Sequence, residues 1–434
     1  MRPSTALLSL EQTPPLAVPL RFFLTAPLFG VAAALLALWI GPEHMGSRWQ
    51  PGVLAFTHLL TLGYLAMVMF GALFQLLPVL VGVRLRRPLP TARAIHLLLV
   101  LGTFLLVTAF LTDADGWFVA AAVMLALALG SFILVIGHAL WNACSVHETV
   151  CAMKLSVTAL GVTLLLGLLL VLAHVGSDLA PRDLLIDLHL AWGLLGWAGL
   201  LLIGVAYQVV PMFQITAEYA PHLRRWLPWA VVLLLITWSL SFLHLPALAW
   251  LPGLGLAMVF ALFAMATLQL QRRRLRRLPD VTVDFWYLGL LCMLAAAGLW
   301  LLHQGWPQVL RLQQFHLWWG VLLLVGSGGA VISGMLYKIV PFLIWLHLNN
   351  RMQAAGQWQG KIPTMRQVIA ERSARHHLYL HLAAVMLLFP GTVWPLLFYP
   401  ALLVLAAAYA VQWWNLVGAA RMYRDVLREA GVQD

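Results

Sequence analysis

Long apolar runs dominate the pattern of hydrophobic and polar positions along this chain. Twelve such runs follow one another, with short polar segments between them. A helix of about 20 apolar residues crosses the hydrocarbon core of a bilayer, and no run alternates apolar and polar positions as a half-buried β-strand does. The pattern therefore predicts an all-α integral membrane protein with twelve transmembrane helices. Their expected ranges are 20–40, 53–82, 94–112, 117–141, 155–175, 188–213, 226–245, 250–270, 285–302, 315–345, 377–393 and 395–420.

An eight-residue pattern recurs in three of these runs. It consists of glycine, any residue, an apolar residue, an aromatic residue, Gln or Lys, two apolar residues and proline. The copies are GALFQLLP from Gly71 to Pro78, GVAYQVVP from Gly204 to Pro211 and GMLYKIVP from Gly334 to Pro341. Because a repeat with a long period reflects repeated structural units, these copies predict three four-helix arcs. The arcs span about 20–141, 155–270 and 285–420 within a single membrane domain, residues 1–434.

The residues of the repeated pattern predict packing and helix ends rather than catalysis. A proline ends or bends a helix, so each copy is expected to mark the end of its transmembrane helix. The glycine two turns earlier is expected to let a neighbouring helix approach closely, as small residues do in membranes. Lys338, in the third copy, is expected to extend its ammonium group to the membrane interface.

Composition and charge support the membrane assignment and give an orientation. The chain is 62% hydrophobic and only 9% charged, whereas soluble domains carry about 25% charged residues. Its net charge of +11 is concentrated in alternate loops, including 272–277 and 346–376, while Asp113, Asp115 and Asp183 lie in the opposite set. The positive-inside rule then predicts cytoplasmic termini and a multi-pass protein of a bacterial-type inner membrane. The basic charge therefore indicates topology and the lipid bilayer as partner, not nucleic acid.

This orientation brings seven of the fifteen histidines to the outer ends of the predicted helices. They are His44, His58, His174, His189, His244, His303 and His316. Histidine within a membrane is costly and usually pairs with another group or binds a metal. We expect ligand roles for His58, His189 and His316, which precede the three copies of the repeat. For His44, His174 and His303 we expect an interfacial imidazole that is hydrogen-bonded near a loop.

With these residues the chain resembles the catalytic subunit of the haem-copper oxidases. The similarity is greatest to the branch of cbb3-type oxidases, nitric oxide reductases and NnrS-like membrane proteins. Three segments carry it: His58 to Pro78 looks like helix 2 of the family, His189 to Pro211 like helix 6, and Phe315 to Pro341 like helix 10. The resemblance implies twelve helices in three arcs, with cofactor ligands near the outer face.

The resemblance also implies a reduced set of cofactor ligands. His58 and His316 match the two axial ligands of the family's low-spin haem, which implies one bis-histidine b-type haem. Gln314 stands where the family has the histidine ligand of a second, high-spin haem. His189 matches a copper ligand, and His244 remains of an adjacent histidine pair, so a copper site would be degenerate. The chain therefore resembles an oxidase subunit whose oxygen-reducing centre has lost ligands.

Three functions are compatible with these observations. The first is a haem-binding membrane protein for electron transfer or for respiratory or nitric-oxide-related metabolism, served by a partner subunit or a donor such as a c-type cytochrome. The second is a transporter or chaperone for haem or copper. The third is an active terminal oxidase or nitric oxide reductase with altered ligation, and any enzymatic activity would then be that of an oxidoreductase. No Asp or Glu lies in the apolar core of a predicted helix, which argues against proton-consuming turnover.

Overall fold

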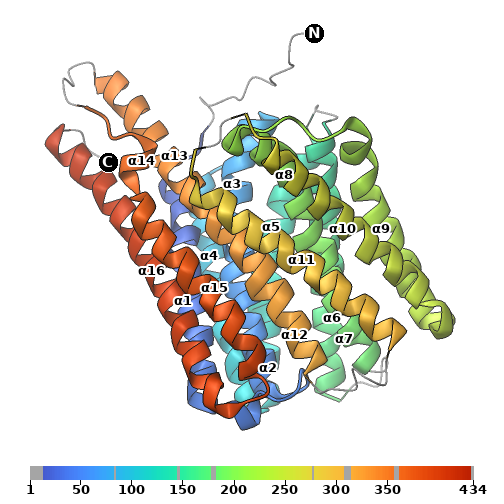
Figure 1. Ribbon diagram of the computed structural model, residues 1–434. Helices are drawn as coiled ribbons and strands as arrows, with labels where there is room; N and C mark the ends of the chain where they lie inside the picture. The colour runs from blue at the N-terminus through green and yellow to red at the C-terminus, as the bar shows by residue number, and fades with distance from the viewer. Residues whose placement is uncertain are drawn as a thin grey trace. The chain divides into compact units, whose positions relative to one another are not determined.

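The computed structural model describes residues 13–82, 85–143, 147–176, 182–275, 278–306, 314–355 and 361–431 (Figure 1). Within these ranges the chain is built from helices, and eleven of them are long and apolar enough to cross a membrane. An all-α fold with this many apolar helices is that of a multi-pass membrane protein, as the apolar runs predict.

Eight of the spanning helices are uninterrupted or nearly so. They are α1 (Ala17–Ile40), α4 (Pro88–Thr112), α5 (Asp115–Trp141), α6 (Glu148–His174), α9 (Pro221–His244), α10 (Trp250–Arg272), α11 (Val281–Gly305) and α16 (Pro395–Glu429). Three short elements connect or follow spanning helices: η2 (Pro42–His44), η5 (Pro246–Leu248) and α14 (Met365–Val368). Each expected range overlaps its helix, but several helices extend beyond it, by seven residues at the start of α6 and by nine at the end of α16.

The three helices that carry the repeated pattern are each divided by a π-helical segment. The first consists of α2 (Pro51–His58), η3 (Leu59–Ala66) and α3 (Met67–Val81). The second consists of α7 (Arg182–Ala191), η4 (Trp192–Gly199) and α8 (Leu200–Gln214). The third consists of α12 (Phe315–Gly320), η6 (Val321–Gly329) and α13 (Ala330–Ala355). Each π segment ends five residues before the glycine that opens the repeated pattern, so the repeat exists in the backbone as well as in the sequence.

A glycine at the end of η4 and of η6 allows the backbone to widen there, whereas η3 ends at Ala66. A Cβ atom on Gly329 would lie 3.1 Å from the carbonyl oxygen of Leu324, and one on Gly199 would lie 3.2 Å from that of Leu194. In both cases the carbonyl belongs to the residue five positions earlier, the partner position of a π-helical hydrogen bond. Glycine, having no Cβ, avoids this crowding.

The twelfth expected span, 377–393, corresponds to α15 (Glu371–Gly391). This helix is not among the eleven, and its first turns carry Arg372, Arg375 and three histidines. It packs side by side with α16 (Figure 1). Because α15 combines a polar first half with an apolar second half, a twelfth crossing stays a prediction.

The region after the third repeat differs from the expected loop 346–376. Pro341 lies inside α13, which continues to Ala355, and α15 already begins at Glu371. Pro78 and Pro211 are likewise inside α3 and α8, although those helices end three residues later. Helices in a membrane tolerate an internal proline because neighbouring groups satisfy the backbone carbonyl that it leaves unbonded. The proline is therefore no reliable end signal in this chain.

Backbone contacts divide the chain into two compact units that cut across the three repeats. The first unit comprises Met1–Val18, Met69–Arg276 and Met293–Leu312, and the second comprises Pro19–Val68, Arg277–Cys292 and Gln313–Asp434. The division into three four-helix arcs stays a prediction.

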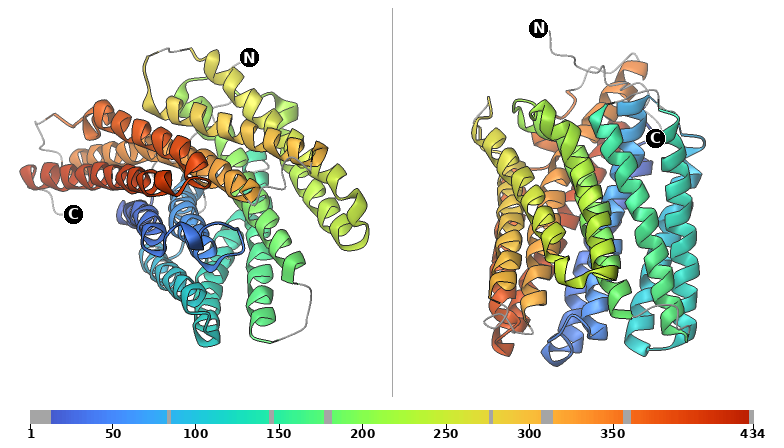
Figure 2. Two further views of the ribbon diagram at one scale, coloured as in Figure 1. Left: turned by 60° about the horizontal axis from the view of Figure 1, so that its bottom comes forward. Right: turned by 90° about the vertical axis from the view of Figure 1, so that its right-hand side faces the viewer.

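Aromatic packing forms part of the core of the first unit. Phe70 of α3 stacks on Phe132 of α5 with ring centroids 3.5 Å apart, and Trp197 of η4 packs edge-on against Phe132. Gly204 of the repeated pattern lies against Ala152 of α6, as its predicted packing role requires. In the same unit α9 and α10 lie side by side (Figure 2).

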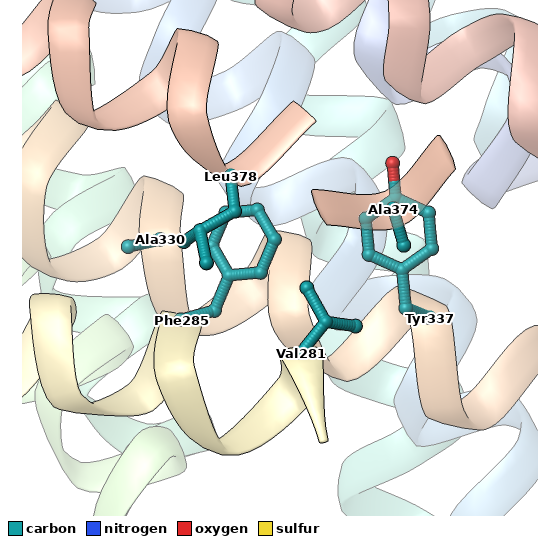
Figure 3. Packing of buried hydrophobic residues seen from close by; sticks show 6 residues of the cluster. All are labelled: Val281, Phe285, Ala330, Tyr337, Ala374 and Leu378. Carbon is teal, nitrogen blue, oxygen red and sulfur yellow. The ribbon is translucent and has the colours of Figure 1, made fainter. Parts of the chain in front are cut away.

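The core of the second unit includes a buried cluster contributed by α11, α13 and α15. Val281 and Phe285 of α11 face α15, and Tyr337 of α13 lies beside Ala374 (Figure 3). Gly334 allows this packing, because a Cβ atom there would lie 2.6 Å from the Cβ of Phe285. The close approach predicted for the glycine of the repeat is thus confirmed at Gly334 as at Gly204.

Candidate functional site

His58 lies at the junction between α2 and η3 in the second unit. Its imidazole is half-buried, and its Nδ1 lies 2.8 Å from the carbonyl oxygen of Leu54. A carbonyl only accepts hydrogen bonds, so Nδ1 carries the proton and the neutral ring keeps its lone pair on Nε2. Metal-binding histidines usually have one nitrogen fixed in this way. The contact is not diagnostic, because His347 makes the same bond to Leu343.

His316 and Gln314 lie at the start of α12, also in the second unit. His316 is exposed, and Gln314 is the half-buried residue that precedes the helix. The backbone carbonyl of Gln314 accepts a bond from the amide of Trp318. Gln314 therefore has a role in starting the helix, whatever the role of its side chain. The ligand role of His316 stays a prediction.

His189 and His244 belong to the first unit and differ in their surroundings. His189 is half-buried, donates from Nδ1 to the carbonyl oxygen of Thr163 at 3.0 Å, and lies against Gly167 of α6. His244 is the exposed last residue of α9. Among the described residues, no group of three or more His, Cys, Asp or Glu side chains is arranged to hold a metal ion. A copper site at this pair stays a prediction.

The three repeat histidines do not occupy equivalent positions. His58 precedes Gly71 by 13 residues, His189 precedes Gly204 by 15, and His316 precedes Gly334 by 18. By contrast, the π segments keep a constant distance to these glycines. The repeated structural feature is therefore the π segment, and each histidine lies shortly before it at a distance of its own.

Two other outer histidines have polar partners typical of loops and helix ends. His174 lies 3.5 Å from a carboxylate oxygen of Asp113 and 3.7 Å from one of Asp115, and Arg182 contacts its other ring nitrogen. His44 bonds to the carbonyl of Ile40. These contacts are those of imidazoles bonded near a loop or helix end, as expected for His174 and His44, while their place at the membrane interface stays a prediction.

A buried pair of histidines in the second unit was not predicted as part of any site. His377 and His381 lie one turn apart on α15, and both are completely buried. Their ring centroids are 5.7 Å apart with the rings nearly perpendicular, and both rings pack against Phe285. His376, the neighbour in sequence, is exposed.

Side chains of α13, α15 and α16 form a chain of hydrogen bonds that ends at His377. Ser373 Oγ donates to Asn415 Oδ1 at 2.5 Å, and Asn415 Nδ2 donates to the Tyr337 hydroxyl at 3.0 Å. The hydroxyl oxygen of Tyr337 lies 3.0 Å from His377 Nδ1. Because the Tyr337 oxygen already accepts from Asn415, its own proton is free to be donated to Nδ1. His377 then carries its proton on Nε2.

His381 has the opposite arrangement. Its Nε2 lies 3.0 Å from the backbone carbonyl of Val325 in η6, so this nitrogen donates and Nδ1 keeps the lone pair. The bond connects α15 directly to the π segment that follows His316. A carbonyl within a π segment is thus held by a side chain of another helix.

A second set of hydrogen-bonded side chains in the same unit involves η3, the other π segment of this unit. The Tyr64 hydroxyl of η3 bonds to Ser333 Oγ at 2.7 Å and to Gln412 Oε1 at 3.0 Å. The ring of Tyr64 packs edge-on against that of Tyr409, which in turn packs against His381. The buried histidines therefore contact Tyr337 of α13 and Tyr409 of α16, and Tyr409 in turn contacts Tyr64 of η3.

Several buried polar atoms of this region have no hydrogen-bond partner within the described part of the chain. They are His377 Nε2, His381 Nδ1, Tyr409 Oη and Gln412 Nε2. Nearly all buried polar groups in proteins are hydrogen-bonded, so such a concentration indicates bound water or another bound species.

Charged side chains lie where α11 and α15 begin. Lys338 pairs with Asp280 at 2.5 Å, and Arg375 contacts both Asp284 at 3.1 Å and Glu371 at 3.0 Å. Lys338 therefore forms an ion pair in place of the isolated interfacial contact expected from the sequence. Ser373, half-buried on the first turn of α15, connects this end of the unit with the hydrogen-bonded chain to His377.

Comparison with known proteins does not extend these observations. No protein-family model matches the chain, and no curated protein matches it at a significant level.

Proposed function

We propose that this membrane protein binds one b-type haem through His58 and His316 and uses it in electron transfer or in respiratory or nitric-oxide-related metabolism. The observation that carries the proposal is the placement of His58 and His316, each shortly before a π segment of the second unit. The Leu54 carbonyl holds the Nδ1 proton of His58, so the lone pair of this ring lies on Nε2, the arrangement usual for metal-binding histidines.

The position of both histidines supports the same proposal. His58 directly precedes η3 and His316 lies five residues before η6, within one unit. π-helical turns are rare and are often found at functional sites, where they change the direction of neighbouring side chains. A haem held by two axial histidines supplies one-electron chemistry without an open coordination position.

Electron transfer fits the chain better than reduction of oxygen or nitric oxide. In the haem-copper oxidases, which this chain resembles, reduction of oxygen or nitric oxide needs a second haem with an open coordination position and a copper ion. Here glutamine occupies the position of the second haem's ligand, and His244 is exposed at a helix end. A partner subunit or a c-type cytochrome would then supply or accept the electron.

The decisive experiment is an optical spectrum of protein purified from a haem-replete host. We expect a narrow α band after reduction, as for a low-spin bis-histidine haem, and loss of most of this band in His58→Ala and in His316→Ala. His174→Ala is the matched control, because His174 is held by Asp113, Asp115 and Arg182 and should leave the spectrum unchanged.

Two results would overturn the proposal. One is purified, folded protein without haem. The other is an unchanged haem band in both His58→Ala and His316→Ala. If haem or copper is instead taken up by vesicles that contain the protein, without a stably bound haem, the protein is a transporter or chaperone.

A further inference from the structure

The buried pair His377 and His381 combines two unpartnered atoms of opposite character. In the arrangement of bonds described above, His377 Nε2 is a donor and His381 Nδ1 is an acceptor, and neither has a partner among the described residues. Leaving either one unsatisfied in an apolar interior costs about 1–3 kcal/mol. We therefore expect a bound group that accepts a hydrogen bond from His377 Nε2 and donates one to His381 Nδ1.

A water molecule has the chemistry that these atoms require. It accepts from His377 Nε2–H and donates to His381 Nδ1 at the same time, whereas a metal ion would need a lone pair on both nitrogens. A buried water needs two to four polar partners. The unpartnered Tyr409 hydroxyl, whose ring packs against His381, is a third polar group in this region.

Gly329 places no side chain in the space beside His381. A Cβ atom at this position would lie 3.4 Å from both His381 Cε1 and the Tyr409 hydroxyl oxygen. Gly329 is the last residue of η6, so the π segment presents a residue without a side chain to His381 and Tyr409. The local geometry thus favours a small polar occupant.

We infer that His377 and His381 form a water-bridged imidazole pair that exchanges protons with solvent from the end of the unit where α15 begins. The inference uses no ligand of the proposed haem and does not depend on that proposal. It also assigns a role to a completely buried pair of ionisable side chains, a feature that is often functional.

Proton movement through the pair requires no change in bonds between heavy atoms. Tyr337 gives its hydroxyl proton to His377 Nδ1, His377 gives its Nε2 proton to the bridging water, and that water gives a proton to His381 Nδ1. A proton from solvent, entering at the end of the unit where the half-buried Ser373 lies, then restores the Tyr337 hydroxyl. His381 is an imidazolium until the same steps in reverse return a proton to solvent. Asn415 is a positioning residue, because its bond to the Tyr337 oxygen directs the hydroxyl proton to His377.

The test is hydrogen exchange of the imidazole N–H groups, measured by solid-state NMR on protein labelled with ¹⁵N-histidine in lipid nanodiscs. His377→Gln and His381→Gln assign the two signals. After transfer to D₂O, we expect His377 Nε2–H to exchange within about a minute despite its burial, whereas amides of the buried core need hours. Tyr337→Phe should slow this exchange at least about tenfold. Tyr379→Phe, on the exposed face of the same helix, is the control and should leave it unchanged.

Each contrary result overturns the inference. Exchange in the wild-type protein that takes hours would show a dry, purely structural cluster, and this measurement needs no variant to fold. Unchanged exchange in Tyr337→Phe would show that protons do not pass through that hydroxyl. A ¹⁵N shift of the pair that disappears after treatment with a chelator would show that the bound species is a metal ion.

Discussion

Gly334 shows how much a single residue can depend on its neighbours. Its Cα lies so close to α11 that an added Cβ would lie 2.6 Å from Phe285 Cβ and 3.2 Å from the carbonyl oxygen of Thr282. A Cβ atom added to Gly298 of α11 would instead meet no neighbouring group within 4 Å. The sequence predicts close packing for the glycine of the repeat, but only the structure distinguishes the crowded glycine from the open one.

We therefore expect opposite effects from two glycine-to-alanine substitutions. Gly334→Ala should lower the free energy of unfolding by about 1–3 kcal/mol, because the helices must move apart. Gly298→Ala should raise it by up to about 1 kcal/mol, because alanine favours the helix. Thermal unfolding of both variants in the same detergent gives the comparison. Equal effects at the two positions would contradict the packing described for Gly334.

The histidines differ in how clearly the sequence indicates their roles. The repeat led to His58, His189 and His316 because they precede a recognisable pattern. No pattern in the sequence predicts a site at His377 and His381, although their spacing of four residues places both on one helix face. Their helix is the most polar of the long ones, so only its packing against Phe285 and Tyr409 shows that the pair is buried.

At the scale of elements, ion pairs connect the start of α11 with α13 and α15. Lys338 and Asp280 retain only 27% and 22% side-chain exposure, so removal of one partner leaves a largely buried charge. Glu218 and Arg224 form an ion pair at 2.9 Å in the first unit, where Arg224 is 18% exposed but Glu218 is 59% exposed, so only one partner is largely buried. Burial, not distance, should decide how much each pair contributes to stability.

Asp280→Asn should therefore lower the free energy of unfolding by about 1–3 kcal/mol, because the Lys338 ammonium loses its partner. The double variant Asp280→Asn/Lys338→Gln should lose less than the sum of the two single changes. For comparison, Glu218→Gln should lower the free energy of unfolding by less than Asp280→Asn does, because solvent screens the exposed Glu218 carboxylate. Chemical unfolding of the four variants measures the coupling, and strict additivity for Asp280 and Lys338 would argue against a direct ion pair.

The π segments are the elements that the sequence does not predict. Apolar runs with scattered glycines are compatible with an α-helix throughout, and propensity does not separate the two helix types. The structure places η3, η4 and η6 at the same distance from three glycines of the repeat. At the ends of η4 and η6 the missing Cβ atoms of Gly199 and Gly329 permit the wider turn, whereas η3 ends at Ala66 and widens without such a glycine.

At the scale of the whole molecule, the open question is whether α15 crosses the membrane. The distribution of basic residues predicts that both termini lie in the cytoplasm, which requires an even number of crossings. Eleven helices meet the length and composition of a span, and α15 would be the twelfth. Its polar first half can extend into the interfacial region while its apolar second half lies in lipid.

Labelling of introduced cysteines with an impermeant maleimide tests this topology. After replacement of the three natural cysteines by serine, Thr392→Cys, between α15 and α16, should be labelled from outside intact cells. Leu275→Cys, after α10, should be labelled only in permeabilised cells, because the surrounding arginines retain that loop inside. Protection of Thr392→Cys in intact cells would show that α15 does not cross.

The sequence by itself determined the class of this protein, the approximate positions of eleven of its long apolar helices, and the repeat. Hydrophobic length is a local property, and a bilayer selects it without reference to partner helices. Tertiary structure decided which glycines are crowded, where helices widen, that Lys338 pairs with Asp280, and that His377 and His381 face a buried polar network. These features depend on residues far apart in sequence, and the bonds from Tyr337 to His377 and from His381 to Val325 exist only once the helices have packed.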